Sequence, residues 1–283
     1  MISTKIVDLY SHFGIERKDA ASGRLFCWVW HTSDQISPLG RTRPAVLILP
    51  GGGYYKVSPR EAEPVAMRFL ARGYAAFALD YSIAPSRYPT SLREAALAMR
   101  YIRENAQALE VNAHMVSAVG FSAGGHLCGT LGTMYDCPEV FDIAAPEVIR
   151  PDALGLCYPV AVSWGNTHEG SFLNLTGNDP QLRARLSLDR LVRPDMPPVY
   201  LWHTRTDKTV PVRNSLILAQ ALDEAGIDFA LHIYRHGSHG LSVADEQCFP
   251  AHSIPDKSSD VTQWPEKMMQ FFSDIGFAIT DRR

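Results

Sequence analysis

The sequence has no apolar run long enough to cross a lipid bilayer, which takes about 18 consecutive apolar residues. Residues 1–8, Met-Ile-Ser-Thr-Lys-Ile-Val-Asp, also lack the basic start and the continuous apolar stretch of a signal peptide. Neither sign of charge dominates, because 27 lysines and arginines stand against 30 aspartates and glutamates. This slightly acidic balance argues against a nucleic-acid surface or a polybasic membrane anchor. We therefore expect a cytoplasmic protein with no nucleic-acid or membrane partner.

Cysteines are few, odd in number and scattered, and no Cys-x-x-Cys spacing occurs. Most have apolar neighbours in the sequence, which is typical of reduced core residues rather than disulfides or metal ligands. No pair of histidines has the spacing of a zinc site. The sequence therefore predicts neither a metal nor a cofactor. The five cysteines are Cys27, Cys128, Cys137, Cys157 and Cys248.

Internal repeats, low-complexity tracts and abrupt changes of composition are also absent. The 283 residues are 46% hydrophobic and 20% charged, an ordinary composition for a globular protein with a sizeable core. We predict a single α/β domain over residues 1–283. The composition leaves the oligomeric state open, a homodimer included.

Short apolar runs alternate with amphipathic segments along the chain. Strands are predicted over 6–9, 25–30, 45–49, 75–79, 115–119, 153–158, 199–204 and 229–234. Helices are predicted over 61–72, 90–107, 123–131, 212–225 and 260–275. This alternation predicts right-handed βαβ units, and hence a mostly parallel central sheet with helices on both faces. The long connection 159–198 is expected to form a small lid over the carboxyl ends of the strands.

The pattern Gly120-x-Ser122-x-Gly124 lies where the apolar strand 115–119 meets the helix 123–131. A strand that turns directly into a helix strains its turn residue and requires very small neighbours, which the two glycines supply. The turn presents Ser122 at a helix N-terminus, where developing negative charge is favoured. The alternative is a chance match in a glycine-containing chain. We predict that Ser122 is a catalytic nucleophile.

A serine nucleophile requires a base within hydrogen-bond reach and a carboxylate that orients the base. Asp207 follows the strand 199–204, and His239 follows the strand 229–234. We predict that these two residues complete a catalytic triad with Ser122. For Asp207 the alternative is a turn or helix-cap residue. For His239 it is the nearby His236, which we consider less suitable because Gly240 gives the loop at His239 more freedom to reach Ser122.

Two backbone N–H groups are expected to bind the oxyanion. One belongs to Ala123, the residue after the nucleophile. The other is expected from the glycine run 51–53, in Gly52 or Gly53, because a glycine backbone can approach the substrate closely. We expect a large side chain at Gly52 to block this site at little cost in stability, because we place the glycines on an exposed loop.

Aromatic residues and one histidine fall on the predicted loops at the strand ends. Aromatic loops suit sugar rings or an aryl group, so we predict substrate contacts for them, with packing of the lid as the alternative. These residues are Tyr54, Tyr55, Tyr81, Trp164, His168 and Phe172.

The sequence resembles the α/β-hydrolases of the esterase/lipase group that carry a Gly-Gly-Gly oxyanion loop. Within that group it is most similar to small bacterial acetyl-xylan or feruloyl esterases, some of which are mislabelled as xylanases. The matching stretches are 49–54 (Leu-Pro-Gly-Gly-Gly-Tyr), 79–85 (Leu-Asp-Tyr-Ser-Ile-Ala-Pro), 120–126 (Gly-Phe-Ser-Ala-Gly-Gly-His) and 238–241 (Ser-His-Gly-Leu), with further matches in 158–160, 171–175 and 203–211. Together they cover most of residues 45–275. Pro50 and Ser82 depart from the family pattern, where histidine and arginine are common.

The resemblance implies the α/β-hydrolase fold and a cofactor-free serine esterase that acts on a small ester. We expect short-acyl, acetyl-type esters, of carbohydrates or similar polar alcohols, because the segment 159–198 is too short and too polar for the broad apolar surface of a lipase. A formamidase or amidase, a feruloyl-type aryl esterase and a catalytically silent binding protein remain alternatives. A peptidase of this fold would need an additional domain to gate its substrate.

Overall fold

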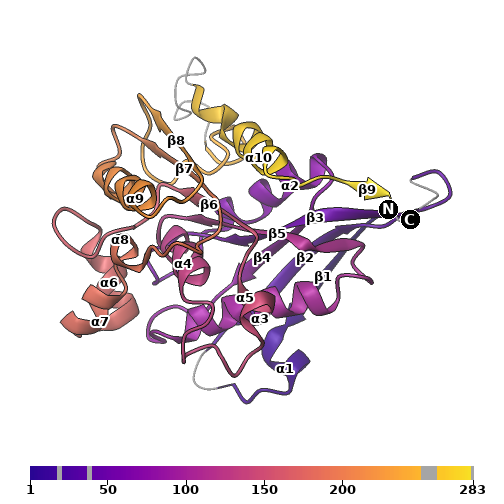
Figure 1. Cartoon of the computed structure of the whole chain (residues 1–283), viewed down its shortest axis with the longest axis horizontal. Helices are drawn as coiled ribbons and strands as arrows, with labels where there is room; N and C mark the ends of the chain where they lie inside the picture. The colour runs from indigo at the N-terminus through magenta and orange to yellow at the C-terminus, as the bar shows by residue number, and fades with distance from the viewer. Residues whose placement is uncertain (18–20, 37–39, 250–259, 282–283) are drawn as a thin grey trace.

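The computed structural model describes residues 1–17, 21–36, 40–249 and 260–281 and centres on one large β-sheet (Figure 1). The strands of the sheet run in the order β1-β2-β4-β3-β5-β6-β7-β8, and β9 pairs with the start of β3. The strands are β1 (Ile2–Asp8), β2 (Arg24–Trp30), β3 (Arg41–Leu49), β4 (Ala75–Asp80), β5 (Val111–Phe121), β6 (Ala153–Cys157), β7 (Val199–Thr204), β8 (Phe229–Tyr234) and β9 (Thr280–Asp281).

The sheet is mostly parallel, as the alternation of strands and helices predicted. All pairings from β4 through β8 are parallel, whereas β1 and β2 join the edge antiparallel. The central strands are buried on both faces and therefore read as continuous apolar runs, which is why their positions could be predicted from the sequence.

Helices cover both faces of the sheet. The helices are α1 (Leu9–Phe13), α2 (Glu63–Ala71), α3 (Thr90–Glu104), α4 (Ala123–Thr133), α5 (Pro146–Ile149), α6 (Glu169–Thr176), α7 (Pro180–Arg185), α8 (Leu188–Leu191), α9 (Arg213–Glu224) and α10 (Trp264–Asp274), with the 3₁₀ helices η1 (Pro59–Glu61) and η3 (Asp260–Gln263).

Successive side chains of β3 point to opposite faces and so enter different hydrophobic layers. Ala45, Leu47 and Leu49 pack with α3, α4 and α9. Val46 and Ile48 pack with α2 and α10, which lie together on the other side of the sheet (Figure 1). The layers hold the strand ends in fixed positions, and the loops at those ends carry the candidate site.

The connection 159–198 is more structured than a simple loop, because it contains α6, α7 and α8. It packs against the carboxyl ends of the strands: the Asn174 side chain donates to the Gly53 carbonyl oxygen at 2.8 Å, and the Tyr88 N–H donates to the Leu175 carbonyl oxygen. Helices of four to eight residues have too little apolar periodicity to be read from sequence, and α1 and α5 were missed for the same reason.

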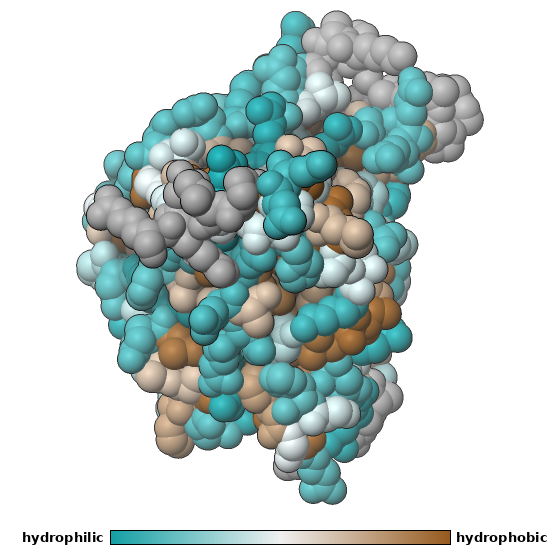
Figure 2. Space-filling model, turned by 90° about the vertical axis from the view of Figure 1, so that its right-hand side faces the viewer, coloured by the Kyte–Doolittle hydropathy of each residue, from teal (hydrophilic) through white to brown (hydrophobic). Residues whose placement is uncertain are grey.

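The face in Figure 2 is mostly hydrophilic, with apolar residues in small, separate groups. In the part of the chain that the structure describes, no helix combines the length and the apolar character needed to span a membrane.

Candidate active site

Ser122 lies at the sharp turn that joins β5 directly to α4. Its φ of 54° and ψ of −117° lie outside the regions that an L-residue usually adopts. A Cβ on Gly120 would collide with the Gly124 carbonyl oxygen, and a Cβ on Gly124 would collide with the Leu49 carbonyl oxygen. Both glycines are therefore required by close backbone contacts around Ser122, as the motif predicted.

Ser122, His239 and Asp207 form a continuous hydrogen-bonded series. The distance from His239 Nε2 to Ser122 Oγ is 2.7 Å, and the distance from His239 Nδ1 to Asp207 Oδ2 is 2.6 Å. Because the carboxylate can only accept, Nδ1 carries the proton and Nε2 is free to accept from the Ser122 hydroxyl. His236, the alternative base, is exposed to solvent and makes neither contact. The geometry is that of an activated serine nucleophile.

The Asp207 carboxylate is held by several donors. Its Oδ1 accepts from the backbone N–H groups of Thr209 at 2.9 Å and Val210 at 3.0 Å. Burial by itself raises the pKa of Asp207, but hydrogen bonds from His203 and His239, with the contribution of the Val210 N–H, outweigh it and hold this pKa well below its usual range. Asp207 is thus ionised at every pH at which a histidine base functions.

His203 is a partner of Asp207 that sequence reasoning did not find. Its Nε2 lies 3.3 Å from Asp207 Oδ2 and 2.8 Å from the Val210 carbonyl oxygen, so that nitrogen carries the proton. Its Nδ1 lies 2.7 Å from Ser215 Oγ. In the sequence, His203 is one residue within a buried strand, and only its distance from Asp207 distinguishes it from a core histidine.

The glycine run provides unpaired backbone donors beside Ser122. The Gly51 N–H is already bound to Glu61 Oε2 at 2.8 Å, so it is not available to a substrate. No acceptor among the described residues pairs with the N–H of Gly52 or Gly53. Ala123 is the first residue of α4, and its N–H therefore has no acceptor within the helix. These three groups can donate to an oxyanion on the substrate.

A cavity of about 170 Å³ gives access to Ser122 and His239. The small volume and the polar character of much of the lining suit a small, polar molecule. The lining residues are Gly52, Gly53, Tyr55, Lys56, Ser58, Arg60, Glu61, Ser122, His168, Thr209, His239 and Gly240.

Two of the six predicted contact residues line this cavity. Tyr55 is half-exposed at its mouth, and His168 lies at the end of the connection that leads into α6. His168 Nδ1 lies 2.8 Å from Ser171 Oγ, which orients the ring. Burial lowers the pKa of His168, so the ring is neutral at pH 7.

The other four predicted contact residues do not line this cavity: three are packed in the interior, and Trp164 is exposed at the surface. Tyr54, Tyr81 and Phe172 are at most 3% exposed, and the Tyr81 hydroxyl donates to the Pro50 carbonyl oxygen at 2.6 Å. Trp164 is 41% exposed, and its indole N–H points away to donate to Asp189. Sequence position placed all four near the strand ends but did not indicate the direction of their side chains.

His126 lies on α4, one helical turn after Ser122, and is buried in the core. Its Nδ1 lies 2.8 Å from the Tyr54 hydroxyl and its Nε2 lies 2.7 Å from the Leu186 carbonyl oxygen. Burial lowers the pKa of His126 to about 4, so the ring stays neutral. This histidine ties the glycine loop to the connection before α8.

The expectation for Gly52 needs correction, because the glycine loop is not exposed. Gly51, Gly53 and Tyr54 are buried, and Gly52 has a φ of 132°. Its carbonyl oxygen accepts from two N–H groups of a tight turn, and a Cβ at this position would collide with the Lys56 carbonyl oxygen. A side chain at Gly52 would force the turn open.

We expect Gly52→Leu to lower kcat by a factor of about 10²–10³, the loss typical of one oxyanion donor, and to lower the melting temperature as well. Steady-state kinetics and thermal unfolding of the same preparation check this. Gly165→Ala is the control, because Gly165 also has a positive φ, of 64°, but has open space for a Cβ and does not line the cavity at Ser122. A Gly52→Leu protein with an unchanged melting temperature would contradict our account of the turn.

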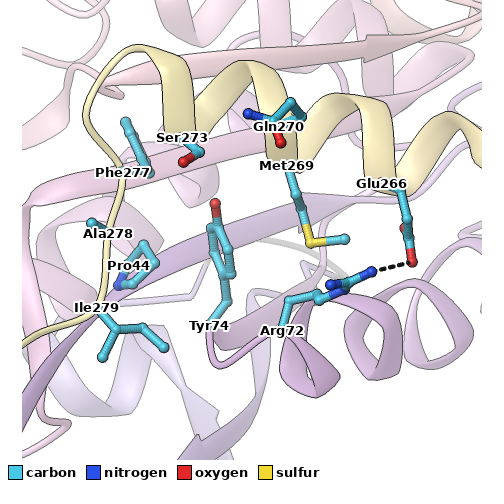
Figure 3. Close-up of a pocket in the computed structure, with 10 residues that line it drawn as sticks. All are labelled: Pro44, Arg72, Tyr74, Glu266, Met269, Gln270, Ser273, Phe277, Ala278 and Ile279. Carbon is cyan, nitrogen blue, oxygen red and sulfur yellow. Dashed lines mark hydrogen bonds and ion pairs between the residues drawn. The ribbon is translucent and has the colours of Figure 1, made fainter.

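A larger cavity, of about 420 Å³, lies at the opposite end of the sheet (Figure 3). It is enclosed by the start of β3, the turn between α2 and β4, α10 and the residues before β9. The Arg72–Glu266 ion pair closes one side at 3.3 Å, and Tyr74 points into the space (Figure 3). Its lining contains no histidine and only one serine, Ser273, so it offers no base for a nucleophile. The chemical groups that line the smaller cavity, rather than the volumes of the two cavities, identify the candidate site.

In the described residues, no group of three or more histidine, cysteine, aspartate or glutamate side chains could hold a metal ion. The five cysteines are all unpaired thiols. The groups that meet at Ser122 are instead its own hydroxyl, the His239 imidazole, the Asp207 carboxylate and unpaired backbone N–H groups.

Residues 37–149 match the BD-FAE family model. The chain is 36% identical over 231 residues to endo-1,4-beta-xylanase B of Butyrivibrio fibrisolvens. The aligned region covers 78% of this chain and 36% of that protein. It is 28% identical to an acetylxylan esterase of Xylanibacter ruminicola, over 81% of this chain and 46% of that protein. The chain thus spans between about a third and a half of the length of these two relatives.

Among solved structures, the acetyl ester-xyloside bifunctional hydrolase from Caldicellulosiruptor lactoaceticus superposes with a TM-score of 0.82 at 32% sequence identity. The match covers 96% of this chain and 97% of that protein. Likeness over nearly the whole of both chains includes every element that carries the candidate site.

Proposed function

Because this chain belongs to the α/β-hydrolase family of esterases, we propose that it hydrolyses carboxylic esters through a triad of Ser122, His239 and Asp207. The observation that carries the proposal is the pair of hydrogen bonds through His239, at 2.7 Å to Ser122 and 2.6 Å to Asp207. These distances support the proposed roles of Ser122 as nucleophile, His239 as base and Asp207 as the carboxylate that orients the base.

In the first half of the reaction, Ser122 Oγ attacks the ester carbonyl carbon while its proton passes to His239 Nε2. Asp207 stabilises the imidazolium that forms. The carbonyl oxygen becomes an oxyanion, and the N–H groups of Ala123 and of Gly52 or Gly53 donate to it. The C–O bond to the alcohol then breaks, and His239 returns the proton to the leaving oxygen, which leaves an acyl group on Ser122.

In the second half, water takes the place of the alcohol. His239 accepts a proton from the water as its oxygen attacks the acyl carbon, and the same backbone donors bind the second oxyanion. Collapse breaks the bond to Ser122 Oγ, which takes the proton back from His239. The acid is released and the resting enzyme is restored, with no cofactor in the cycle.

We further propose that the substrate is an acetyl-type ester of a carbohydrate or similar polar alcohol. The cavity at Ser122 has a volume of about 170 Å³, below the roughly 300–1,000 Å³ of pockets for drug-sized ligands. The polar side chains of Lys56, Ser58 and Thr209 on its walls suit hydroxyl groups of the alcohol. Two similar proteins are named for acetylxylan or acetyl-ester hydrolysis, which supports the same class.

We expect kcat/KM to fall steeply from acetate and butyrate to decanoate in a series of p-nitrophenyl esters. One methylene group in a shaped pocket changes discrimination by about 1–3 kcal/mol, and this cavity has no room for a long chain. Acetylated xylo-oligosaccharides should be deacetylated under the same conditions.

The control substrate is p-nitroacetanilide, which presents the same acyl and aryl groups through an amide and should be cleaved far more slowly. Faster cleavage of the anilide than of the acetate ester would favour an amidase. A maximum at eight or more carbons, or activation at an oil–water interface, would contradict the assignment to short acyl groups.

A further inference from the structure

Glu61 is a buried carboxylate at the edge of the candidate site. It ends η1, lines the cavity at Ser122 and is only 3% exposed. Burying a carboxylate is costly unless it is well paired. Among the described residues Glu61 forms no ion pair, and it accepts instead from the Gly51 N–H and the Tyr158 hydroxyl. A buried carboxylate that accepts only from these neutral donors calls for a functional reason.

One oxygen of Glu61 holds the glycine loop. Oε2 accepts from the Gly51 N–H at 2.8 Å. A Cβ on Gly51 would lie 2.7 Å from Oε2, 2.8 Å from the Phe121 carbonyl oxygen and 3.0 Å from Ser122 Cβ. The carboxylate, the glycine backbone and the nucleophile are therefore in close packing, and a shift of Glu61 moves the donors at Gly52 and Gly53.

The other oxygen leads to the loop that carries His239. Oε1 accepts from the Tyr158 hydroxyl at 2.7 Å, and that hydroxyl accepts from the Ser242 N–H at 3.0 Å. The Tyr158 ring also packs edge-on against His239, with centroids 5.1 Å apart. A second link runs from the Ser242 hydroxyl to the carbonyl oxygen of Arg60, the neighbour of Glu61.

We propose that Glu61 is a positioning residue that joins the oxyanion loop to the His239 loop through Tyr158, so that base and oxyanion donors stay in register around Ser122. The inference rests on the proposed function, because it assigns to Glu61 the alignment of that triad with its donors. The carboxylate also places a negative charge near His239, which favours the imidazolium formed in the transition state.

Several titratable groups face Glu61. Burial is the largest influence on the pKa of Glu61 and raises it, whereas the hydrogen bonds from Tyr158 and Gly51 and the charges of His239 and Arg60 act in the opposite direction. Tyr81 and Cys157 also feel the charge of Glu61, and burial raises the pKa of both, so they stay neutral. Glu61 thus faces two groups that can carry a positive charge, His239 and Arg60.

The test compares Glu61→Gln with Glu94→Gln. Glu94 is a matched control, because it is also a buried carboxylate with neutral donors only, from Tyr10 and Ser82, and lies outside the cavity at Ser122. Glutamine at position 61 keeps the shape and one acceptor but removes the charge. For Glu61→Gln we expect kcat to fall at least about tenfold with KM nearly unchanged. For comparison, a misplacement of 1 Å in an active site lowers the rate by about 10²-fold.

The acid limb of the kcat/KM profile should also move to lower pH in Glu61→Gln, because loss of the negative charge disfavours protonation of His239. Glu94→Gln should lose thermal stability without either kinetic change. Tyr158→Phe keeps the ring but removes the hydrogen bonds of the hydroxyl with Glu61 and Ser242, and it should lower kcat similarly. This variant replaces Glu61→Gln in the test if Glu61→Gln fails to fold. Wild-type kinetics and an unshifted profile in the folded variants would overturn the proposal.

Labelling by a fluorophosphonate distinguishes failure of the positioning role of Glu61 from failure of the proposed function. If the wild-type protein neither reacts at Ser122 nor hydrolyses p-nitrophenyl acetate, the triad assignment fails and the role of Glu61 falls with it. If the wild-type protein does both, slower labelling of Ser122 in Glu61→Gln than in Glu94→Gln supports the positioning role. Equal labelling rates in the two variants contradict it.

Discussion

Ser122→Ala is expected to lower kcat by a factor of about 10⁶, the loss that follows removal of the nucleophile of a triad. The substitution removes only Oγ, whose one side-chain hydrogen bond in the described structure is to His239. The glycines that accommodate the turn remain, so the melting temperature should hardly change. Hydrolysis of p-nitrophenyl acetate, covalent labelling by a fluorophosphonate and thermal unfolding together check the prediction.

Ser273→Ala is the matched control for Ser122→Ala. Ser273 lines the larger cavity at the far end of the sheet, where Figure 3 shows it on α10. Its replacement should leave turnover and labelling unchanged. Loss of activity in Ser273→Ala, with retention in Ser122→Ala, would move the reaction to that cavity and contradict our assignment.

His239→Ala is expected to be nearly as damaging as Ser122→Ala, whereas His236→Ala should keep most of the activity. Without His239, no base lies 2.7 Å from Ser122 Oγ to accept its proton. His236 is solvent-exposed and has no contact with Asp207 or Ser122. Parallel measurement of kcat for the two variants distinguishes them, and the reverse order of severity would show that the base lies elsewhere.

The pH profile of the wild-type protein gives an independent test of His239. The value of kcat/KM should rise between about pH 5 and 8, because the free enzyme needs a neutral histidine to accept the Ser122 proton. The pKa of Asp207 is held well below its usual range, so its carboxylate stays ionised and loses its charge only as the pH falls far below this interval. A flat profile over this interval would count against a histidine base.

Local sequence determined most of the framework. Buried parallel strands must be apolar on both faces, so the bounds of the fully buried strand β7 were predicted as 199–204, in agreement with the structure. The strand-to-helix turn at Ser122 could also be predicted from the sequence, because close backbone contacts restrict positions 120 and 124 to glycine. Each of these features leaves a local pattern in the sequence, although the contact that excludes a side chain at Gly124 comes from Leu49 on β3.

Long-range contacts decided the rest. Glu61 carries no local pattern, yet it joins Gly51 to Tyr158, which lies 97 positions further along the chain. The contact of His239 with Ser122 spans 117 positions. The direction of a loop side chain depends likewise on what packs around it, which is why residues predicted at the strand ends divided between the cavity and the core. The sequence by itself specified the strands, the turn at Ser122 and the order of the chemical groups, because these follow from local sterics and periodicity. The tertiary structure alone decided which groups surround and align Ser122, because those contacts join segments that are far apart along the chain.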